Sequence, residues 1–301
     1  MTAVTVTRAG ELSAESGLVG MLSPEQLETW NRDGVLHVPR FLTGDALAAI
    51  VAVVDEIGRR ADGEDGLLQH YELGPDGAQI CRSEHLIDGC PALRELLTSG
   101  AMPAMAGELL GEPAVLYKEK VNYKLAGGAG FAPHQDAPAY PFIDTHTTCM
   151  LAIDDATLEN GCLEVVDGRH AEVLPMDDTG CIRGEIVAGF DWRHVPIAAG
   201  DLLWFHSRAP HRSGPNLSDR RRRGLFCTYN ATSHGDLRTE YYAEKLARFA
   251  DASEGERTRV SLIGDFQGRA PTADQIRDLE RRQAEVRQAE LRRAGQRQAQ
   301  Q

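Results

Sequence analysis

This chain of 301 residues lacks the features that mark membrane, secreted or disulfide-linked proteins. No stretch approaches the roughly 20 apolar residues that a membrane helix needs. The N-terminal sequence MTAVTVTRAGELSAESG has no apolar core of the kind found in secretory signals. Six cysteines are scattered without a CxxC pair, which excludes a cysteine-based zinc site. We therefore expect reduced thiols, a cytoplasmic location and no membrane partner.

Positive charge is also scarce. Lys and Arg number 32 against 45 Asp and Glu, which gives a net charge of −13. Because phosphate backbones and anionic lipids bind clustered positive charge, this balance argues against a nucleic-acid or membrane partner. The one dense basic run, Arg220 to Arg223, is too short to change that conclusion. We expect a small-molecule substrate and a monomer or homodimer.

Helical signals dominate the first third of the chain. Residues 1–20 are small and polar and predict a mobile arm. Ser23-Pro24-Glu25-Gln26 has the pattern of a helix start with a capping box, and Thr43 precedes a second helical stretch. A short strand is expected within 34–39 between them. Two more helices are expected near 91–98 and 102–110.

After residue 112 the pattern changes to short strands separated by turn signals. Apolar or β-branched runs occur at 114–122, 147–153, 162–166, 200–205 and 224–229. They predict an α+β protein with a double-stranded β-helix (jelly-roll, cupin-like) core over about 112–232, flanked by the N-terminal helices and a C-terminal helix. The core belongs to a single domain over 21–250. The Gly- and Asp-rich segments 61–80 and 172–195 are expected to be lid loops, and 251–301 a helical, partly disordered tail.

Histidine–carboxylate pairs are the candidate metal sites. The motif His-x-Asp/Glu occurs at His134-Gln135-Asp136, His170-Ala171-Glu172 and His234-Gly235-Asp236. Residues i and i+2 of an extended segment face the same side, so one short segment can supply two ligands to one ion. Two histidines and one carboxylate, with three positions left open, suit Fe(II) in oxygen-activating enzymes.

The three pairs are not equivalent. His170 lies in a turn, and no histidine follows His234 to complete a site. His134 and Asp136 follow a glycine-rich segment, and His211 lies just beyond the apolar strand at 202–205. We therefore favour His134, Asp136 and His211 as the metal ligands.

Arg222 stands eleven residues after His211, at the entry to a strand. A guanidinium fixed beside the metal suits a dicarboxylate co-substrate, because it pairs with a carboxylate through two hydrogen bonds. Ser213 lies two residues past His211 and could donate to the same carboxylate. Arg220, Arg221 and Arg223 are alternatives to Arg222 for this role.

These motifs, with Glu159 to His170 and the strand that ends at Asn230, resemble the phytanoyl-CoA dioxygenase family, including its ectoine-hydroxylase-like members. The resemblance covers residues 25–245 and is densest over 118–230. It implies that His134, Asp136 and His211 bind Fe(II), that Arg222 and Ser213 hold 2-oxoglutarate, and that O2 is consumed. The implied reaction is hydroxylation of an unactivated C–H bond with release of succinate and CO2, and desaturation or cyclisation on the same iron is an alternative outcome.

Further contacts follow from the same resemblance. The family places 2-oxoglutarate contacts on the strand that holds Lys118, Lys120 and Asn122, although with other residue types. The alternative is an edge strand whose lysines point outward and block aggregation. The loop after Asp136 often contacts substrate in this family, which makes Tyr140, Phe142 and His146 candidates, although aromatic residues can also simply anchor a loop. Gln135 lies between two of the implied ligands and is a further candidate, with exposure to solvent as its alternative.

Two other functions fit the same ligands. A non-catalytic jelly-roll module could hold a structural metal, and a zinc hydrolase could use the same triad. A structural metal has no need of Arg222 beside open coordination positions, and the hydrolase needs a general base that the sequence does not identify. Formation of succinate from 2-oxoglutarate would separate the oxygenase from both.

Overall fold

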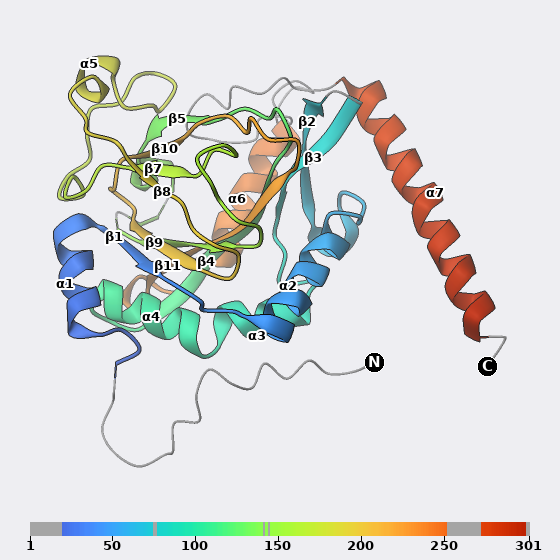
Figure 1. The fold of residues 1–301 in the computed structure, drawn as a ribbon, viewed down its shortest axis with the longest axis horizontal. Helices are drawn as coiled ribbons and strands as arrows, with labels where there is room; N and C mark the ends of the chain where they lie inside the picture. The colour runs from blue at the N-terminus through green and yellow to red at the C-terminus, as the bar shows by residue number, and fades with distance from the viewer. Residues whose placement is uncertain (1–19, 75–76, 141, 144, 252–271, 299–301) are drawn as a thin grey trace, which may run out of the picture.

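Two antiparallel sheets form the core of the computed structural model, which describes residues 20–74, 77–140, 142–143, 145–251 and 272–298 (Figure 1). In spatial order the larger sheet contains β1 (Val35–Val38), β9 (Leu202–His206), β6 (Thr147–Ala152), β11 (Arg222–Ala231), β4 (Ala114–Lys124), β3 (Gly77–Glu84) and β2 (Leu68–Gly74). The smaller sheet contains β5 (Phe131–His134), β10 (His211–Ser213), β7 (Leu163–Val165) and β8 (Arg193–Val195). The two sheets make the jelly roll that the strand pattern predicts.

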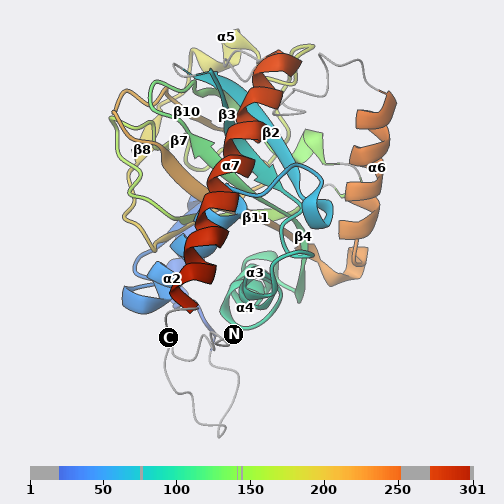
Figure 2. The same ribbon diagram turned by 90° about the vertical axis from the view of Figure 1, so that its right-hand side faces the viewer.

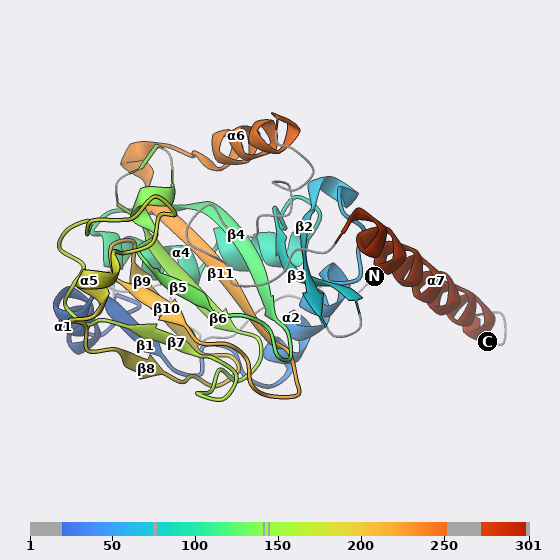
Figure 3. The ribbon, with the colours of Figure 1, turned by 90° about the horizontal axis from the view of Figure 1, so that it is seen from above.

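Helices flank this core. They are α1 (Pro24–Asp33), α2 (Gly44–Ile57), α3 (Pro91–Thr98), α4 (Ala101–Leu110), α5 (Gly184–Val187), α6 (Arg238–Asp251) and α7 (Ala273–Gln298), with short 3-10 turns η1 (Glu64–Gly66), η2 (Ala137–Ala139) and η3 (Thr232–His234). Helices α1 to α4 cover the outer face of the larger sheet, and α6 runs along its side near β4 (Figures 2 and 3). No described helix has the length and apolarity required to cross a membrane.

The predicted start of α1 is confirmed. The backbone N–H of Gln26 donates to Ser23 Oγ, and the N–H of Ser23 donates to Gln26 Oε1 over 2.8 Å. This capping box satisfies backbone donors that the first turn of a helix leaves without partners. The helix ends at Gly34, whose φ of +70° is favourable for glycine.

Side chains of the larger sheet alternate between two cores. Leu151 and Cys149 on β6, and Leu225 on β11, face the helices, whereas Met150 and Phe226 face the smaller sheet. This alternation follows from the two-residue period of a strand. The inner face therefore surrounds the space between the sheets, and the candidate site lies there.

The segment 61–80 differs from the prediction of a lid loop. Most of it belongs to the β2–β3 hairpin, which extends the larger sheet beyond β4. The segment 172–195 contains α5, all of β8 and an isolated bridge between Met176 and Ile182, and is otherwise irregular. The arm predicted at 1–20 falls, apart from Gly20, outside the described residues, as does 252–271 of the tail. Helix α7 packs Ile276 and Leu279 against the core and then extends away from the body (Figures 1 and 3).

Candidate active site

Two histidines and one aspartate meet between the sheets. His134 ends β5, Asp136 follows it, and His211 begins β10, which pairs directly with β5. One potential ligand atom from each lies within 4.8 Å of the other two, and all three residues are at least nine-tenths buried. Among the described residues, this is the single group of three or more such side chains close enough to share a metal ion. Neither of the other two His-x-Asp/Glu motifs belongs to such a group.

Backbone contacts orient both imidazoles. His134 Nδ1 lies 2.7 Å from the carbonyl oxygen of Ala132, and His211 Nδ1 lies 3.0 Å from that of Ala209. A carbonyl can only accept, so each Nδ1 is the protonated nitrogen and each Nε2 keeps its lone pair. His134 Nε2 lies 3.9 Å from Asp136 Oδ1. The free lone pairs and the carboxylate therefore fit a divalent metal ion.

The protonation states also suit a metal. Burial lowers the pKa of His134 to about 3, with a further contribution from His211, so this imidazole is neutral. Burial on its own would raise the pKa of Asp136, but the neighbouring His211, His134 and Lys120 outweigh it and hold the pKa below the usual range. Thr148 Oγ1 donates to Asp136 Oδ2 over 3.3 Å and fixes the carboxylate.

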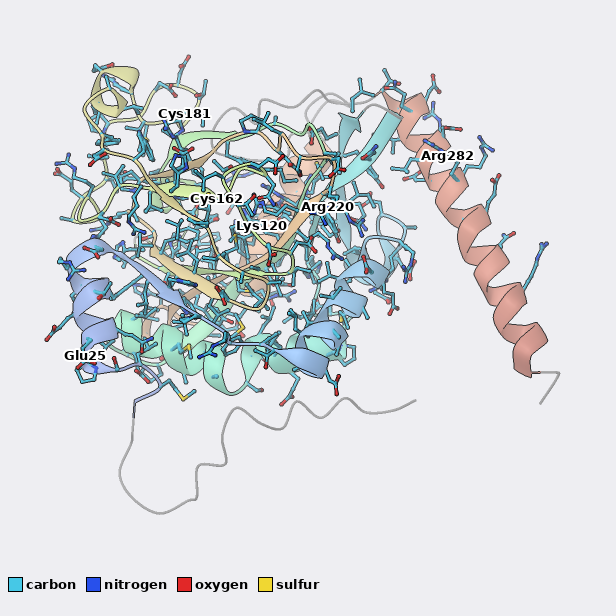
Figure 4. The ribbon with its side chains drawn as sticks, viewed as in Figure 1. Glu25, Lys120, Cys162, Cys181, Arg220 and Arg282 are labelled. Carbon is cyan, nitrogen blue, oxygen red and sulfur yellow. The ribbon has the colours of Figure 1, made fainter. Side chains whose placement is uncertain are left out.

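A cavity opens beside the triad, and its wall is rich in Lys and Arg side chains. Lys120, labelled in Figure 4, lies inside the molecule on this wall. The Lys and Arg side chains of the lining are Arg82, Lys118, Lys120, Lys124, Arg212, Arg222 and Lys245, and the carboxylates are Glu72, Glu84 and Asp136. An acidic protein that gathers buried cations around one cavity is suited to bind anions there.

Arg222 and Ser213 lie at one end of the cavity. Arg222 is 5% exposed; its Nη2 donates to the carbonyl of Gly161 over 3.1 Å, while its buried Nε has no hydrogen-bond partner within the described part of the chain. Burial lowers the pKa of Arg222 to about 10, which leaves it charged at neutral pH. A buried guanidinium with unused donors fits an incoming carboxylate.

Lys124 lies beside Arg222 and Ser213 and was not among the residues predicted for the site. Its Nζ donates to Ser213 Oγ over 2.9 Å and to the carbonyls of Gly161 and Gly214. Burial, followed by the charge of Arg222, lowers the pKa of Lys124 to about 7. Lys124 lies two residues beyond Asn122 on the same face of the strand, and this position could have identified it as a site residue. Gly161 is needed for this packing, because a Cβ there would lie 2.3 Å from the carbonyl oxygen of Gly214.

Strand register sets the order of residues along the cavity. Arg222 pairs with Lys124, Gly224 with Asn122, Phe226 with Lys120 and Thr228 with Lys118. Thr228 also pairs with Thr148, the residue that holds Asp136. The cavity thus runs from Arg222 and Lys124, past Asn122 and Lys120, to Lys118 at the level of the triad. Lys118, Lys120 and Asn122 all face inward, and the edge-strand alternative does not apply to them.

The far end of the cavity holds Tyr140 and two residues of α6. Lys118 Nζ lies 3.8 Å from the ring centre of Tyr140 and 5.5 Å from that of Tyr241. Lys245 Nζ forms an ion pair with Glu84, which is itself buried. No sequence motif identified Tyr241 or Lys245, because α6 reaches the cavity only through the tertiary fold.

Three candidate substrate contacts lie away from the cavity lining. Gln135 is fully buried; its amide nitrogen donates to the carbonyls of Glu172 and Arg208, and its oxygen accepts from the N–H of Leu174. His146 is buried with its ring centre 4.6 Å from that of Tyr140, and burial lowers its pKa to about 3. Phe142 is 55% exposed. Of the four candidates, Tyr140 alone appears among the described lining residues.

The other arginines of the basic run point elsewhere. Arg223 bonds to Asp154 and Asp55 on the outer side of the sheet, and Arg221 bonds to Asp55. Arg220 is exposed. The structure therefore brings Arg222, and not its neighbours, to the triad's cavity.

A jelly roll with two histidines and one carboxylate at a cationic cavity defines a metal-dependent oxygenase of the Fe(II)-binding type. The profile of the phytanoyl-CoA dioxygenase family matches residues 30–224. The chain belongs to this family, as the motifs predicted, and it is an Fe(II)- and 2-oxoglutarate-dependent dioxygenase.

Two curated proteins and one solved structure are similar to this chain over most of its length. A methylphosphonate hydroxylase of Gimesia maris is 45% identical over 251 residues, covering 82% of this chain and 96% of that protein. A 2-aminoethylphosphonate dioxygenase from an uncultured bacterium is 36% identical and covers 76% and 90%. The crystal structure of EctD from S. alaskensis with 2-oxoglutarate and 5-hydroxyectoine has a TM-score of 0.64 at 20% identity, covering 73% and 80%, which supports the fold.

Proposed function

We propose that this dioxygenase hydroxylates a small organophosphonate. One C–H bond of the substrate becomes C–OH, while 2-oxoglutarate loses CO2 and becomes succinate. One atom of O2 enters each of these two products, so the reaction needs no other oxidant. The cationic cavity beside the triad carries this proposal, and the two phosphonate-oxidising relatives support it.

His134, Asp136 and His211 would hold the iron. When bound with 2-oxoglutarate and O2, iron supplies the oxidising power that replaces a C–H hydrogen. The chain contributes two imidazoles, oriented by the carbonyls of Ala132 and Ala209, and a carboxylate fixed by Thr148. Burial of these groups keeps bulk water away from the reacting centre.

Arg222, Ser213 and Lys124 would hold the far carboxylate of 2-oxoglutarate. They lie together at the end of the cavity remote from Lys118, and Ser213 is two residues from His211 on the same strand. Asn122 and Lys120 lie between that end and the triad and would flank the co-substrate. This order leaves Lys118, included among the 2-oxoglutarate contacts in the sequence analysis, to face the substrate.

Lys118 and Lys120 would bind the phosphonate group. Neither ammonium group has a carboxylate within ion-pair distance among the described residues. Burial, followed by the charge of Lys120, lowers the pKa of Lys118 well below its usual value, and burial lowers that of Lys120 to about 7. A phosphonate dianion would offset both the burial and the repulsion between neighbouring cations, so its binding would favour the protonated form of both lysines.

The substrate's methyl or short alkyl group would then face the triad and Tyr140. If the substrate is methylphosphonate, no second carbon is present, and hydroxylation is favoured over desaturation or cyclisation. The six cysteines are unbridged, which supports a cytoplasmic enzyme. We also propose that it acts as a monomer or homodimer without a nucleic-acid partner.

The test compares isosteric substrates. Fe(II)-loaded protein is incubated with 2-oxoglutarate and either ethylphosphonate or propionate, and with methylphosphonate in a parallel reaction. We expect the phosphonates, and not propionate, to stimulate succinate formation, with hydroxymethylphosphonate detected by ³¹P NMR. Succinate formation that no phosphonate stimulates would refute the substrate class while leaving the dioxygenase class intact.

A further inference from the structure

Glu84 is a buried carboxylate at the end of β3, on the substrate side of the cavity. It is 1% exposed and pairs across the sheet with Lys120. Its oxygens contact Lys245 Nζ, Arg82 Nη1 at 3.4 Å and His70 Nε2 at 3.5 Å. Burial alone would raise the pKa of Glu84, but Lys245, His70 and Arg82 outweigh it and keep the group ionised. The dioxygenase mechanism proposed above makes no use of this carboxylate.

Lys245 reaches Glu84 from α6, outside the jelly roll. Arg238, Tyr241, Tyr242 and Lys245 are spaced three, four and seven residues along α6 and share one helical face. Arg238 anchors that face by donating to both carboxylate oxygens of Glu119, at 2.6 and 3.0 Å. Tyr242 adds a hydrogen bond to the carbonyl of Glu119. The ammonium group of Lys245 is therefore held in place in the cavity wall.

The Glu84–Lys245 ion pair bears on substrate choice, because two relatives differ in the charge of their substrates. Methylphosphonate has no amine, whereas 2-aminoethylphosphonate carries an ammonium group beside its phosphonate. A pocket that accepts the second substrate needs an anionic partner for that ammonium. Glu84 is the only carboxylate on the described lining near Lys118 besides the metal ligand Asp136, and Lys245 already occupies it.

We propose that Lys245 acts as a built-in ammonium group that neutralises Glu84 and restricts the enzyme to phosphonates without an amine. The inference rests on the proposed phosphonate substrate class. A substrate ammonium entering this end would meet Lys118, Lys120, Arg82 and Lys245 with no available carboxylate, so its desolvation would be uncompensated. Specificity then comes from repulsion of the aminated analogue as well as attraction of the phosphonate.

The variant Lys245→Ala tests the proposed restriction, because it removes the ammonium group that pairs with Glu84. The substrates are 2-aminoethylphosphonate and propylphosphonate, which have similar size and differ in the terminal amine. We expect the wild type to prefer propylphosphonate, and the ratio of kcat/KM for the aminated over the alkyl substrate to rise at least about tenfold in Lys245→Ala. Lys245→Arg, which keeps the charge, and Arg248→Ala, on the exposed side of α6, are expected to keep the wild-type ratio.

Binding supplies a readout that is independent of turnover. Propylammonium is titrated calorimetrically into the wild type, Lys245→Ala and the double variant Glu84→Gln/Lys245→Ala. We expect binding in Lys245→Ala alone, because only that protein offers an ionised Glu84 whose Oε2 has lost its Lys245 partner, while Arg82 and His70 contact Oε1. Lys245→Met replaces Lys245→Ala in both experiments if the smaller side chain lowers the melting temperature into the assay range.

Each outcome is informative. An unchanged substrate ratio with no propylammonium binding in Lys245→Ala overturns the inference. A loss of methylphosphonate turnover as large as in Lys118→Ala would make Lys245 a phosphonate ligand and would also overturn it. If the wild type oxidises no phosphonate, the proposed function fails, and the propylammonium titration still decides whether Lys245 occupies an ammonium site.

Discussion

Replacing Arg222 with methionine is expected to weaken 2-oxoglutarate binding strongly while leaving the fold intact. The guanidinium is 5% exposed, and its described contacts are a hydrogen bond to the Gly161 carbonyl and a 3.9 Å contact with Met150 Sδ. Methionine fills similar space and removes a buried charge, which is often neutral for stability. The variant should therefore melt within a few degrees of the wild type.

The expected loss of 2-oxoglutarate affinity follows from the burial of the Arg222 guanidinium. Truncating one partner of a buried, hydrogen-bonded charge pair costs about 2–5 kcal/mol, and each 1.4 kcal/mol is about tenfold in affinity. Ser213 and Lys124 would still contact the carboxylate, so we expect the low end of this range, a rise in KM for 2-oxoglutarate of about 30- to 100-fold. The KM for the phosphonate should change by less than about threefold, since Lys118 and Lys120 are unaltered.

Arg223→Met is the matched control. Arg223 is the next residue of β11, but it donates to Asp154 and Asp55 on the opposite side of the sheet. The Arg223→Met substitution should lower the stability of the protein and leave the KM for 2-oxoglutarate unchanged. Succinate formation measured against 2-oxoglutarate concentration provides the assay. The reasoning is refuted if Arg222→Met keeps a KM within threefold of the wild type, or if Arg223→Met raises it equally.

Three further predictions concern the metal, the co-substrate and Gln135. His211→Ala should abolish anaerobic Fe(II) binding, measured by equilibrium dialysis, whereas His170→Ala should not; equal loss in both would contradict the ligand assignment. Burial and, next, the charge of Arg222 lower the pKa of Lys124 to about 7, while Cys162, Glu164 and Glu72 act in the opposite direction. Lys124 is charged below that pH, so the KM for 2-oxoglutarate should rise as pH increases through 7. Lys124→Met should flatten this pH dependence. An equally steep profile in Lys124→Met would exclude Lys124 as its source. Gln135→Ala leaves three backbone groups unpaired and should destabilise the fold by about 2–3 kcal/mol, seen in urea unfolding, with the substrate KM unchanged; a KM effect without destabilisation would instead place Gln135 against substrate.

Local sequence signals predicted the elements whose formation depends on neighbouring residues. The capping box at Ser23 and the apolar run of β6 need no tertiary information, and both are confirmed. The hairpin β2–β3 was missed because buried polar residues such as His70, Arg82 and Glu84 break the alternation that identifies a strand. The sequence Gly74-Pro75-Asp76-Gly77 is a turn signal that could have indicated it.

The site was predictable to the extent that its residues share short motifs. His134 and Asp136 are two positions apart, and the spacing from His211 to Arg222 identified the remaining parts of the motif. Strands β5 and β10 are too short for any periodicity, so no local pattern could predict that they pair and bring the histidines together. Lys245 reaches the cavity from α6, more than 30 residues after His211, and only the packing of that helix reveals its proximity.

The central claim is that one O2 molecule is shared between 2-oxoglutarate and a phosphonate at this triad. Single turnover of the Fe(II) enzyme under ¹⁸O2 with methylphosphonate, read by mass spectrometry, tests it most directly. We expect equal amounts of succinate and hydroxymethylphosphonate, with one ¹⁸O atom in the succinate and labelled oxygen in the phosphonate hydroxyl. Unlabelled succinate, or labelled succinate accompanied by unmodified methylphosphonate, would contradict it.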